Sequence, residues 1–320
     1  MSKKKNALLI NLEYYILISL AFIFKLTPLK FCYMIGTTCA WLIFVFDARH
    51  RNRTIKHLIF AGITDNEIDA KRMAKENFIH FGRVAVEILK VKQYLNPETC
   101  RDMITPTGSP KAVEMFFTSE KPTPCIVITA HYGNWEIAGM GYSILSGNPL
   151  LTVMRPFDNP KIGQHVYNER EGFNHRICPK EGALKSLIAA LRKNESVCII
   201  SDQHTVKSEG VVVDFFGHPA RTHASPAMLH LKTKVPILVS ISKRVAPMKF
   251  EFVCADPIIF DTPTGDKERD IIEITQRCST ALENLIREEP LQWMWAHRRW
   301  LDVREKKRNV SKKKLDKTQK

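Results

Sequence analysis

The 320 residues suffice for one sizeable hydrophobic core, and no Gly/Ser-rich linker separates two comparable halves, so one main domain is predicted. The formal net charge of +15 calls for a polyanion, an anionic membrane or an acidic protein as partner, and composition alone does not choose among them. The eight cysteines form no CxxC pair and several lie in apolar runs, which argues against a disulfide scaffold and indicates reduced core residues in a reducing compartment.

Two apolar runs near the start of the sequence indicate a membrane. Residues 7–24 are apolar except for Asn11, Glu13 and Ser19, and residues 31–46 carry no charge. Each run is near the lower limit for spanning, because a bilayer core takes about 20 helical residues. We expect one N-terminal membrane-anchor helix at 7–24, without a convincing signal-peptide cleavage site, and 31–46 packed at the interface or under the core. The excess of Lys and Arg beyond the second run predicts a cytoplasmic orientation.

A long amphipathic helix follows. Thr64 and Glu67 have the spacing of a capping box ahead of a periodic stretch from 67 to about 93. Pro97 lies just beyond the stretch, which predicts that the helix ends before it. This helix is interpreted as scaffold.

Strands and helices alternate through the rest of the chain. Residues 125–130 read as a short buried strand with β-branched residues at 126–129. Further strands are predicted at 150–154, 197–201, 211–216, 237–242 and 250–254, and helices at about 160–172, 181–193, 225–233 and 268–288. This alternation predicts an α/β fold with a mostly parallel or mixed central sheet covered by helices on both faces. Ligands of such sheets bind beyond the carboxyl ends of the strands.

The hexapeptide HYGNWE, residues 131–136, directly follows the strand at 125–130. Gly133 permits a tight turn and Asn134 is a favoured helix N-cap, so a strand–turn–helix context is expected. Glu136 would then lie in the first helical turn, where the helix dipole stabilises its ionised form. We expect its carboxylate to meet the ring of His131, which predicts a general base with its orienting acid.

His131 also admits a structural or a metal-binding interpretation. A lone histidine is more often structural than catalytic, and a metal site could be assembled on paper. Its candidate ligands would be His131, His204, His218, His223 and Asp202. However, the sequence has no HExxH, and no GxSxG for a serine nucleophile. Cys125 begins an apolar strand, which favours burial over reactivity.

Direct acyl transfer remains, with neither metal nor cofactor. His131 would take a proton from an acceptor hydroxyl, the oxygen would attack a thioester carbonyl, and Glu136 would hold the ring tautomer. Backbone amides near 133–135 or a nearby basic side chain are candidate donors to the oxyanion.

Five motifs in order carry a family resemblance. They are HYGNWE, TVMRP at 152–156, SDQH at 201–204, KVPI at 234–237 and WMWAHRRW at 293–300. Together they resemble the lipid A biosynthesis (late) acyltransferases, a branch of the lysophospholipid acyltransferase superfamily, whose signature is a histidine, four residues and an acid. The resemblance extends to about residue 302. It implies a glycerolipid-acyltransferase-like fold and transfer of a fatty acyl chain from acyl carrier protein to a hydroxyl of an acylated Kdo-lipid A precursor, at the cytoplasmic face of the bacterial inner membrane.

The resemblance also implies roles for single residues. His131 matches the family's general base and Glu136 its acidic partner. Arg155 matches a basic residue of the second block, and Asp202 with Gln203 occupies the third. The glycerolipid branch usually has aspartate in the first motif and an acid followed by glycine in the third, so Glu136 and the DQH sequence favour the lipid A branch. They leave open whether Asp202 positions its loop or touches substrate.

Basic and aromatic side chains fit an anionic lipid substrate. Arginines such as Arg221, Arg298 and Arg299 could grip sugar phosphates by forked hydrogen bonds or could be ordinary surface charge. The predicted substrate-binding residues are Asn134, Arg155, Asp202, Gln203, Arg221 and Arg298. Trp293, Trp295 and Trp300 could form an interfacial cluster or pack in the core. A basic surface would steer an acidic carrier protein into contact.

Three segments are predicted: a membrane anchor and interfacial segment at 1–46, an acyltransferase domain at 47–302 and a basic tail at 303–320. Residues 304–320 hold nine Lys or Arg against two acids, a net charge of +7, which suits either a solvating tail or a membrane-surface contact. The rival functions are a glycerolipid (lysophospholipid) acyltransferase and a non-catalytic module that binds anionic membranes. Nucleic-acid binding is not expected, because the tail has no interleaved aromatic residues.

Overall fold

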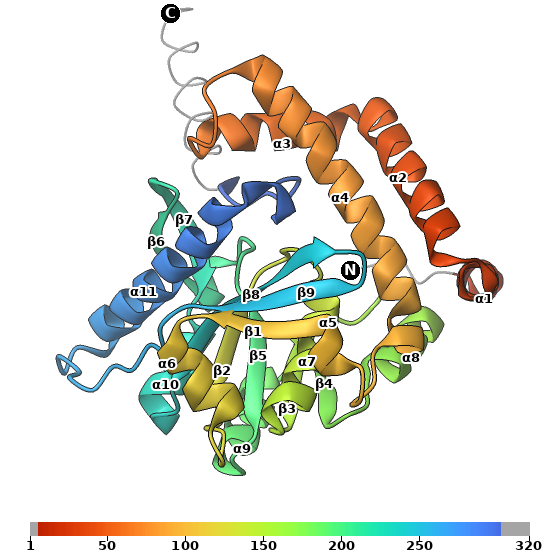
Figure 1. Cartoon of the computed structure of the whole chain (residues 1–320). Helices are drawn as coiled ribbons and strands as arrows, with labels where there is room; N and C mark the ends of the chain where they lie inside the picture. The colour runs from red at the N-terminus through yellow and green to blue at the C-terminus, as the bar shows by residue number, and fades with distance from the viewer. Residues whose placement is uncertain (1–5, 302–320) are drawn as a thin grey trace, which may run out of the picture.

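The computed structural model describes residues 6–301, in which a seven-stranded sheet is the central layer (Figure 1). Its strands are β1 (Ile104–Gly108), β2 (Ile126–Thr129), β3 (Leu150–Met154), β4 (His175–Pro179), β5 (Ser196–Ile200), β8 (Ile237–Ala246) and β9 (Lys249–Cys254). The strand order is β1-β9-β8-β2-β5-β3-β4. Neighbouring strands pair in parallel except β8 and β9, which are antiparallel. The predicted α/β fold with a mostly parallel sheet is confirmed.

Helices cover both faces of the sheet. Within residues 6–301 the helices are α1 (Ala7–Leu26), α2 (Leu29–Phe46), α3 (Ala48–Phe60), α4 (Glu67–Tyr94), α5 (Cys100–Met103), α6 (Pro110–Val113), α7 (Trp135–Ser146), α8 (Pro160–Arg170), α9 (Ala183–Arg192), α10 (Ser225–Thr233) and α11 (Lys267–Glu288). Of these, α1 and α2 lie outside the layer that covers the sheet, against other helices (Figure 1). Along β2, Ile126 and Ile128 join one hydrophobic core with α9, α10 and α11, whereas Val127 joins a second core with α5 and α7. Because side chains alternate along a strand, a strand that is apolar throughout must be buried on both faces.

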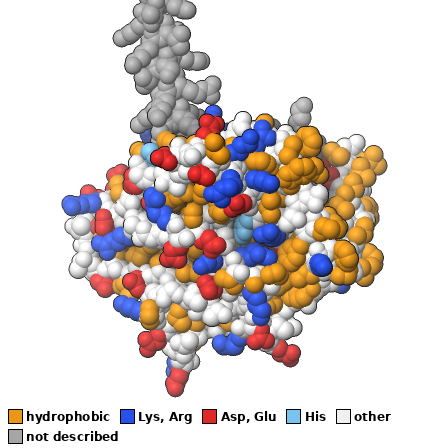
Figure 2. Space-filling model, turned by 45° about the horizontal axis from the view of Figure 1, so that its top comes forward, with side chains coloured by type: hydrophobic (Ala, Val, Ile, Leu, Met, Phe, Trp, Pro, Cys, Tyr) orange, Lys and Arg blue, Asp and Glu red, His pale blue; other side chains and the backbone are white. Residues whose placement is uncertain are grey.

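The two N-terminal helices are both long and apolar enough to cross a membrane by length and composition. Among the described residues, none of the α1 side chains is buried, and its mean hydropathy is 2.0. In contrast, α2 packs on α4, where a Cβ built at Gly82 would lie 2.5 Å from the carbonyl oxygen of Gly36. Apolar side chains gather on the side of the molecule where α1 and α2 lie (Figure 2).

Two local predictions need correction. The N-cap of α4 is Asn66, whose Oδ1 accepts from the amide of Ile68 at 2.8 Å, while Thr64 accepts from the amide of Asn66. The strand predicted at 211–216 is β6 (Gly210–Phe215), which within residues 6–301 pairs only with β7 (His218–His223), in a separate antiparallel hairpin. Phe216 and Gly217 connect the two strands with φ of 58° and 72°, the left-handed geometry that two-residue hairpin turns require.

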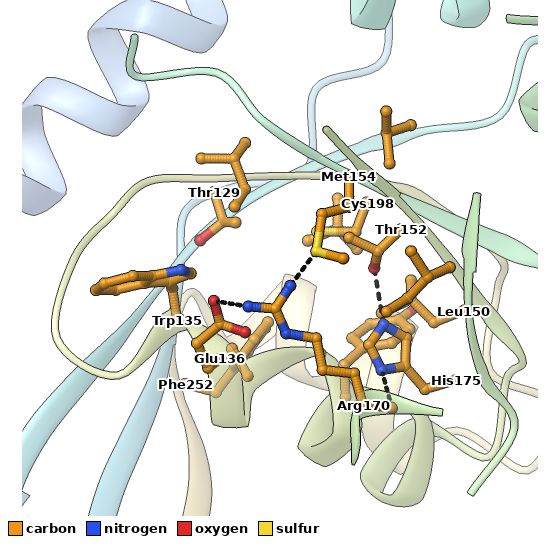
Figure 3. Close-up of a pocket in the computed structure, with 17 residues that line it drawn as sticks. Thr129, Trp135, Glu136, Leu150, Thr152, Met154, Arg170, His175, Cys198 and Phe252 are labelled. Carbon is orange, nitrogen blue, oxygen red and sulfur yellow. Dashed lines mark hydrogen bonds and ion pairs between the residues drawn. The ribbon is translucent and has the colours of Figure 1, made fainter. Parts of the chain in front are cut away.

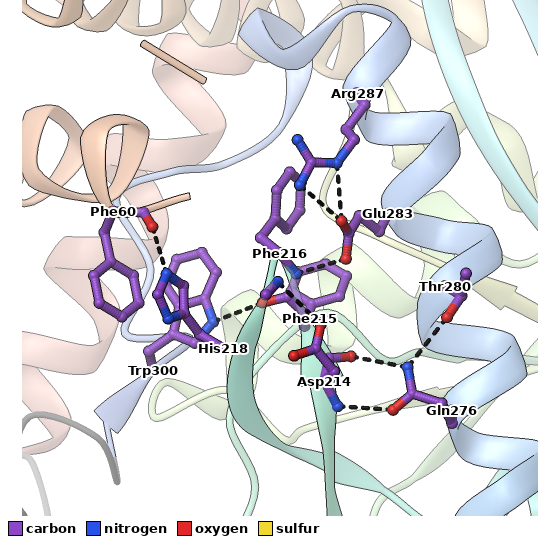
Figure 4. Close-up of polar contacts among 11 residues, drawn as sticks. Phe60, Asp214, Phe215, Phe216, His218, Gln276, Thr280, Glu283, Arg287 and Trp300 are labelled. Atoms are coloured by element: carbon purple, nitrogen blue, oxygen red, sulfur yellow. Dashed lines mark hydrogen bonds and ion pairs between the residues drawn. The ribbon is translucent and has the colours of Figure 1, made fainter. Parts of the chain in front are cut away.

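Polar contacts fasten this hairpin to α11 (Figure 4). Gln276 accepts from the amide of Asp214 at 2.7 Å and donates to its carbonyl oxygen at 3.2 Å. Glu283 accepts from the amide of Phe216 at 2.5 Å and pairs with Arg287. The β6–β7 hairpin is therefore attached to the domain through α11, although its strands do not pair with the central sheet.

Candidate active site

The segment that leaves β2 adopts the predicted strand–turn–helix geometry. Gly133 has φ of 52°, and its amide donates to the carbonyl oxygen of Gln292 at 2.9 Å. The next amide, of Asn134, donates to the carbonyl oxygen of Ser242 at 3.1 Å. Asn134 is the N-cap of α7, and its Oδ1 accepts from the amide of Ile137 at 3.3 Å. These bonds hold the turn against β8 and the segment 290–295, and so set the position of His131.

Replacing Gly133 by alanine is expected to lower the free energy of unfolding by at least about 2 kcal/mol. A Cβ at this position would lie 1.8 Å from the carbonyl oxygen of Ser242, and φ is in the left-handed region. Gly147 is the matched control, because it has φ of 70° but no described atom within 4 Å of a Cβ. Gly147→Ala should cost only about 1 kcal/mol. Thermal unfolding of the detergent-solubilised chain measures both; equal losses would contradict the steric argument.

His131 is held by Asp202, the residue two positions after β5. The Nδ1 of His131 donates to Asp202 Oδ1 at 2.9 Å, and the His131 amide donates to Oδ2 at 2.9 Å. Trp293 Nε1 also donates to Oδ2 at 2.9 Å. Since β2 and β5 are adjacent and parallel, both residues lie at the carboxyl edge of the sheet. The carboxylate therefore fixes the histidine through its backbone and its ring at once.

Glu136 lies elsewhere than expected. Its carboxylate pairs with Arg170, at the end of α8, and Arg170 also contacts Met154 (Figure 3). Within residues 6–301, the bonds recorded for the His131 ring go to Asp202 and Gln203. The expectation that the Glu136 carboxylate meets the ring is therefore corrected: Asp202 occupies the Nδ1 side, and the first turn of α7 directs Glu136 into a neighbouring cavity. Glu136 still acts on His131 through its charge.

Electrostatics keep the Asp202 carboxylate ionised. Burial would raise the pKa of Asp202, but the charge and hydrogen bond of His131, with weaker help from His297 and Trp293, hold it well below its usual range. Burial would lower the pKa of His131, but Asp202 and then Glu136 outweigh it, so this pKa is raised. Burial also raises the pKa of Glu136, against the opposing charges of Arg170 and His131.

These shifts predict a pH profile. A general base must be unprotonated, so kcat/KM should fall as the pH drops through the pKa of His131. Because this pKa is raised above the ordinary 6.5, the midpoint of the acid limb should lie above pH 6.5. Glu136→Gln removes one of the raising charges and should move that midpoint to lower pH. Steady-state rates between pH 5 and 9 measure it, and a midpoint at or below 6.5 in the unaltered chain would contradict the assignment.

The other predicted site residues lie at different distances from the His131 ring and differ in exposure. Asn134 is buried, and its Nδ2 donates to Glu87 at 3.3 Å, so it supports the start of α7. Gln203 Nε2 lies 3.1 Å from His131 Nδ1 and 3.3 Å from Nε2, beside the ring. Arg155 is exposed beyond the carboxyl end of β3, Arg221 is half-buried on β7, and Arg298 is exposed.

Arg299 is buried, whereas the adjacent Arg298 is exposed. Its guanidinium donates to the carbonyl oxygens of Gln203 and Arg221 at 3.3 and 2.8 Å, and to Thr222 Oγ1 at 2.6 Å. Burial lowers its pKa to about 10, so it stays charged at neutral pH. The alternative of structural pairing therefore holds for Arg299, which fastens the loop carrying Asp202 to β7.

Sequence reasoning missed how the WMWAHRRW segment enters the site. Trp293, Trp295 and Trp300 are all fully buried, so they pack in the core and do not form an interfacial cluster. Trp293 nevertheless binds Asp202 directly. His297 stacks parallel to His131, with ring centroids 6.3 Å apart, and burial lowers its pKa to about 4. The WMWAHRRW motif is one of the five that carry the family resemblance, but no local pattern predicts a contact across 91 residues.

A largely apolar cavity lies beside Glu136, between the sheet and α7 (Figure 3). Its apolar lining includes Val127, Leu150, Cys198 and Phe252. Its polar lining includes Glu136, Arg170, Thr152 and His175, of which the last two are hydrogen-bonded at 2.9 Å. Trp135 also lines this cavity and contacts the ring of His131, so the cavity lies next to the histidine.

Metal ligands do not gather at this site: within residues 6–301, no group of three or more His, Cys, Asp or Glu is arranged to hold an ion. A histidine oriented by a buried carboxylate, at the carboxyl edge of an α/β sheet, is placed as a general base would be.

The chain belongs to the bacterial lipid A biosynthesis acyltransferase family, whose profile matches residues 1–302. It is similar to the phosphatidylinositol mannoside acyltransferases of two Mycobacterium tuberculosis strains, CDC 1551 / Oshkosh and ATCC 25618 / H37Rv, each 26% identical over 189 residues. The match covers 57% of this chain and 57% of each relative. The corresponding protein of Mycolicibacterium smegmatis is 28% identical over 112 residues, 34% of this chain and 36% of the relative. Family and relatives together support an O-acyltransferase.

Proposed function

We propose that this protein transfers a fatty acyl chain from acyl carrier protein to a hydroxyl of an acylated Kdo-lipid A precursor. The observation that carries the proposal is the bond between His131 Nδ1 and the buried Asp202. Trp135, which contacts the His131 ring, also lines the apolar cavity. Family membership supports the lipid A class of acceptor. The net charge of +15 supports an acidic carrier protein as donor.

The mechanism is general-base catalysis without a covalent acyl-enzyme. With Nδ1–H bound to Asp202, His131 Nε2 carries the lone pair that removes the proton from the acceptor hydroxyl. Gln203 lies almost equally far from both ring nitrogens, so it does not occupy the axis of that lone pair. The acceptor oxygen attacks the thioester carbonyl, and the tetrahedral intermediate collapses to an ester. The carrier thiolate leaves and takes the proton back from Nε2.

Two carboxylates serve this mechanism in different ways. Asp202 fixes the ring and stabilises the imidazolium that forms when Nε2 is protonated. Glu136, paired with Arg170, adds negative charge and borders the cavity proposed for the donor's acyl chain. The oxyanion donors proposed from the sequence, the amides near 133–135, are partly engaged, since those of Gly133 and Asn134 bond to Gln292 and Ser242.

The membrane setting completes the proposal. The anchor and interfacial segment at 1–46 includes α1 and α2, and the acyltransferase domain spans 47–302; the basic tail at 303–320 lies outside the described residues. We place the domain at the cytoplasmic face of a bacterial inner membrane, because basic residues follow the second apolar run. Arg155, Arg221 and Arg298 are the proposed contacts to the sugar phosphates.

The test is an acceptor competition with the purified full chain. One acyl donor, supplied as the carrier-protein or the coenzyme A thioester, is offered with an acylated Kdo-lipid A precursor, a lysophospholipid and a mannosylated phosphatidylinositol. The third acceptor is the second candidate, because the named activity of the mycobacterial relatives favours it. Turnover of the lipid A precursor is expected to dominate. Turnover of only one of the other two would replace the proposed substrate, and the absence of any turnover would favour a membrane-binding module.

A further inference from the structure

An apolar groove lies between α2 and α4, away from the cavity beside Glu136. Ile35, Cys39 and Ile43 line it from α2, and Phe78, Phe81 and Ala85 line it from α4. We call it the α2–α4 groove. The two helices cross in close contact at Gly36 and Gly82, where a Cβ on either residue would meet the other's carbonyl oxygen. Most of the α2 side chains in the groove are also exposed: Ile35 by 41% and Ile43 by 52%.

The inner end of the groove reaches the candidate active site. Met294 lines the groove, and its amide donates to the carbonyl oxygen of His131 at 3.0 Å. Phe81 contacts the edge of Trp135, with ring centroids 6.0 Å apart. Trp135 in turn contacts the ring of His131 at 5.2 Å and lines the cavity beside Glu136. The groove thus adjoins His131 through Met294, and the cavity adjoins it through Trp135.

Phe24 of α1 and three exposed α2 residues, Ile35, Cys39 and Ile43, line the outer side of the groove. They belong to the part of the molecule where apolar side chains gather on the surface (Figure 2). An apolar area of this extent is stable only when lipid or another apolar surface covers it. Both helices have the length and composition of membrane helices. The space beside them is therefore accessible to the hydrocarbon chains of a bilayer.

We propose that the α2–α4 groove takes one acyl chain of the acceptor lipid directly from the bilayer. This inference rests on the proposed function, since it needs an acceptor that carries acyl chains. The acceptor stays in the membrane throughout the reaction, whereas the donor's chain arrives on a soluble carrier protein. The groove that opens toward the lipid therefore fits the acceptor, and the cavity between the sheet and α7 is left for the donor.

The kinetic test uses a substitution at an exposed residue of the groove wall, whose larger side chain would occupy the groove. Cys39→Trp adds a large side chain to the groove wall, and Thr38→Trp places the same side chain on the neighbouring, exposed position outside the lining. We expect Cys39→Trp to raise KM for the acceptor about tenfold, the loss expected when about two methylenes are no longer buried. KM for the carrier-protein donor should change by less than about twofold, and Thr38→Trp should leave both values unchanged.

Several results would overturn the assignment. A raised KM for the donor would place the donor's chain in the groove, and unchanged kinetics would leave it a lipid-covered surface only. Ala85→Trp, at an exposed position on the facing helix, repeats the test should Cys39→Trp melt at a lower temperature. The assays use whichever acylated acceptor the unaltered chain turns over. If the proposed substrate class is wrong, the unaltered chain will turn over another acceptor. If the groove assignment is wrong, Cys39→Trp will leave KM for that acceptor unchanged.

Photocrosslinking tests occupancy without turnover. The inactive His131→Ala chain is mixed with an acylated Kdo-lipid A precursor that carries a diazirine on one acyl chain, in vesicles of unlabelled phospholipid. Crosslinks should map to α2 and α4 by peptide mass spectrometry and should be competed by unlabelled precursor. Equal labelling by a diazirine phospholipid, without competition by the precursor, would show that bulk bilayer lipid fills the groove and would overturn the proposal.

Discussion

Replacement of His131 by alanine is expected to lower kcat/KM for acyl transfer about 10²–10⁴-fold, the usual contribution of a positioned general base. Without Nε2, the acceptor hydroxyl must lose its proton to water. The substitution leaves the backbone bond from residue 131 to Asp202 in place, so the fold should be retained. Initial rates with saturating donor and varied acceptor measure the loss.

His165→Ala is a suitable control for that variant. His165 lies on α8 with its ring against Tyr14, outside the site, so its removal should change kcat/KM by less than about threefold. Full activity of His131→Ala would contradict the enzymatic role and would favour the non-catalytic, anionic-membrane-binding alternative.

Asp202→Asn is expected to reduce kcat/KM by a comparable factor, about 10²–10⁴-fold, for a different reason. Asp202 Oδ2 accepts from both the His131 amide and Trp293 Nε1, so an asparagine oxygen is held there and its NH₂ faces Nδ1. Nδ1 must then accept, which moves the ring proton to Nε2 and removes the lone pair needed for catalysis. Loss of the carboxylate charge should also shift the acid limb of the pH profile to lower pH.

Glu136→Gln is the matched comparison for Asp202→Asn. Each substitution removes one carboxylate near His131, but only Asp202 is hydrogen-bonded to the ring. The Glu136 variant should therefore lose less activity, mainly through its effects on the His131 pKa and on Arg170. If Glu136→Gln proves the more damaging change, then Glu136 is the orienting acid during catalysis and the arrangement described here must rearrange when substrate binds.

The chemistry of HYGNWE depends on a residue 71 positions further along the chain. The strand, the glycine turn and the asparagine cap around His131 and Glu136 could be predicted from the sequence, because they are local features. Which acid bonds to the His131 ring depends on contacts between segments that are far apart in the sequence. The parallel pairing of β2 with β5 brings Asp202 to the Nδ1 side, and α8 supplies Arg170 to hold Glu136 away.

The sequence by itself determined the α/β class, the N-cap at Asn134 and the apolar N-terminal helices, and it made His131 the candidate for the site. These follow from hydrophobic periodicity, turn chemistry and capping, which act over a few residues. Tertiary structure alone decided the order of the strands, the separate β6–β7 hairpin, the burial of Trp293 beneath Asp202 and the α2–α4 groove. Each of these depends on contacts between segments far apart in the chain, where sheet register and helix crossing, rather than local propensity, determine which side chains meet.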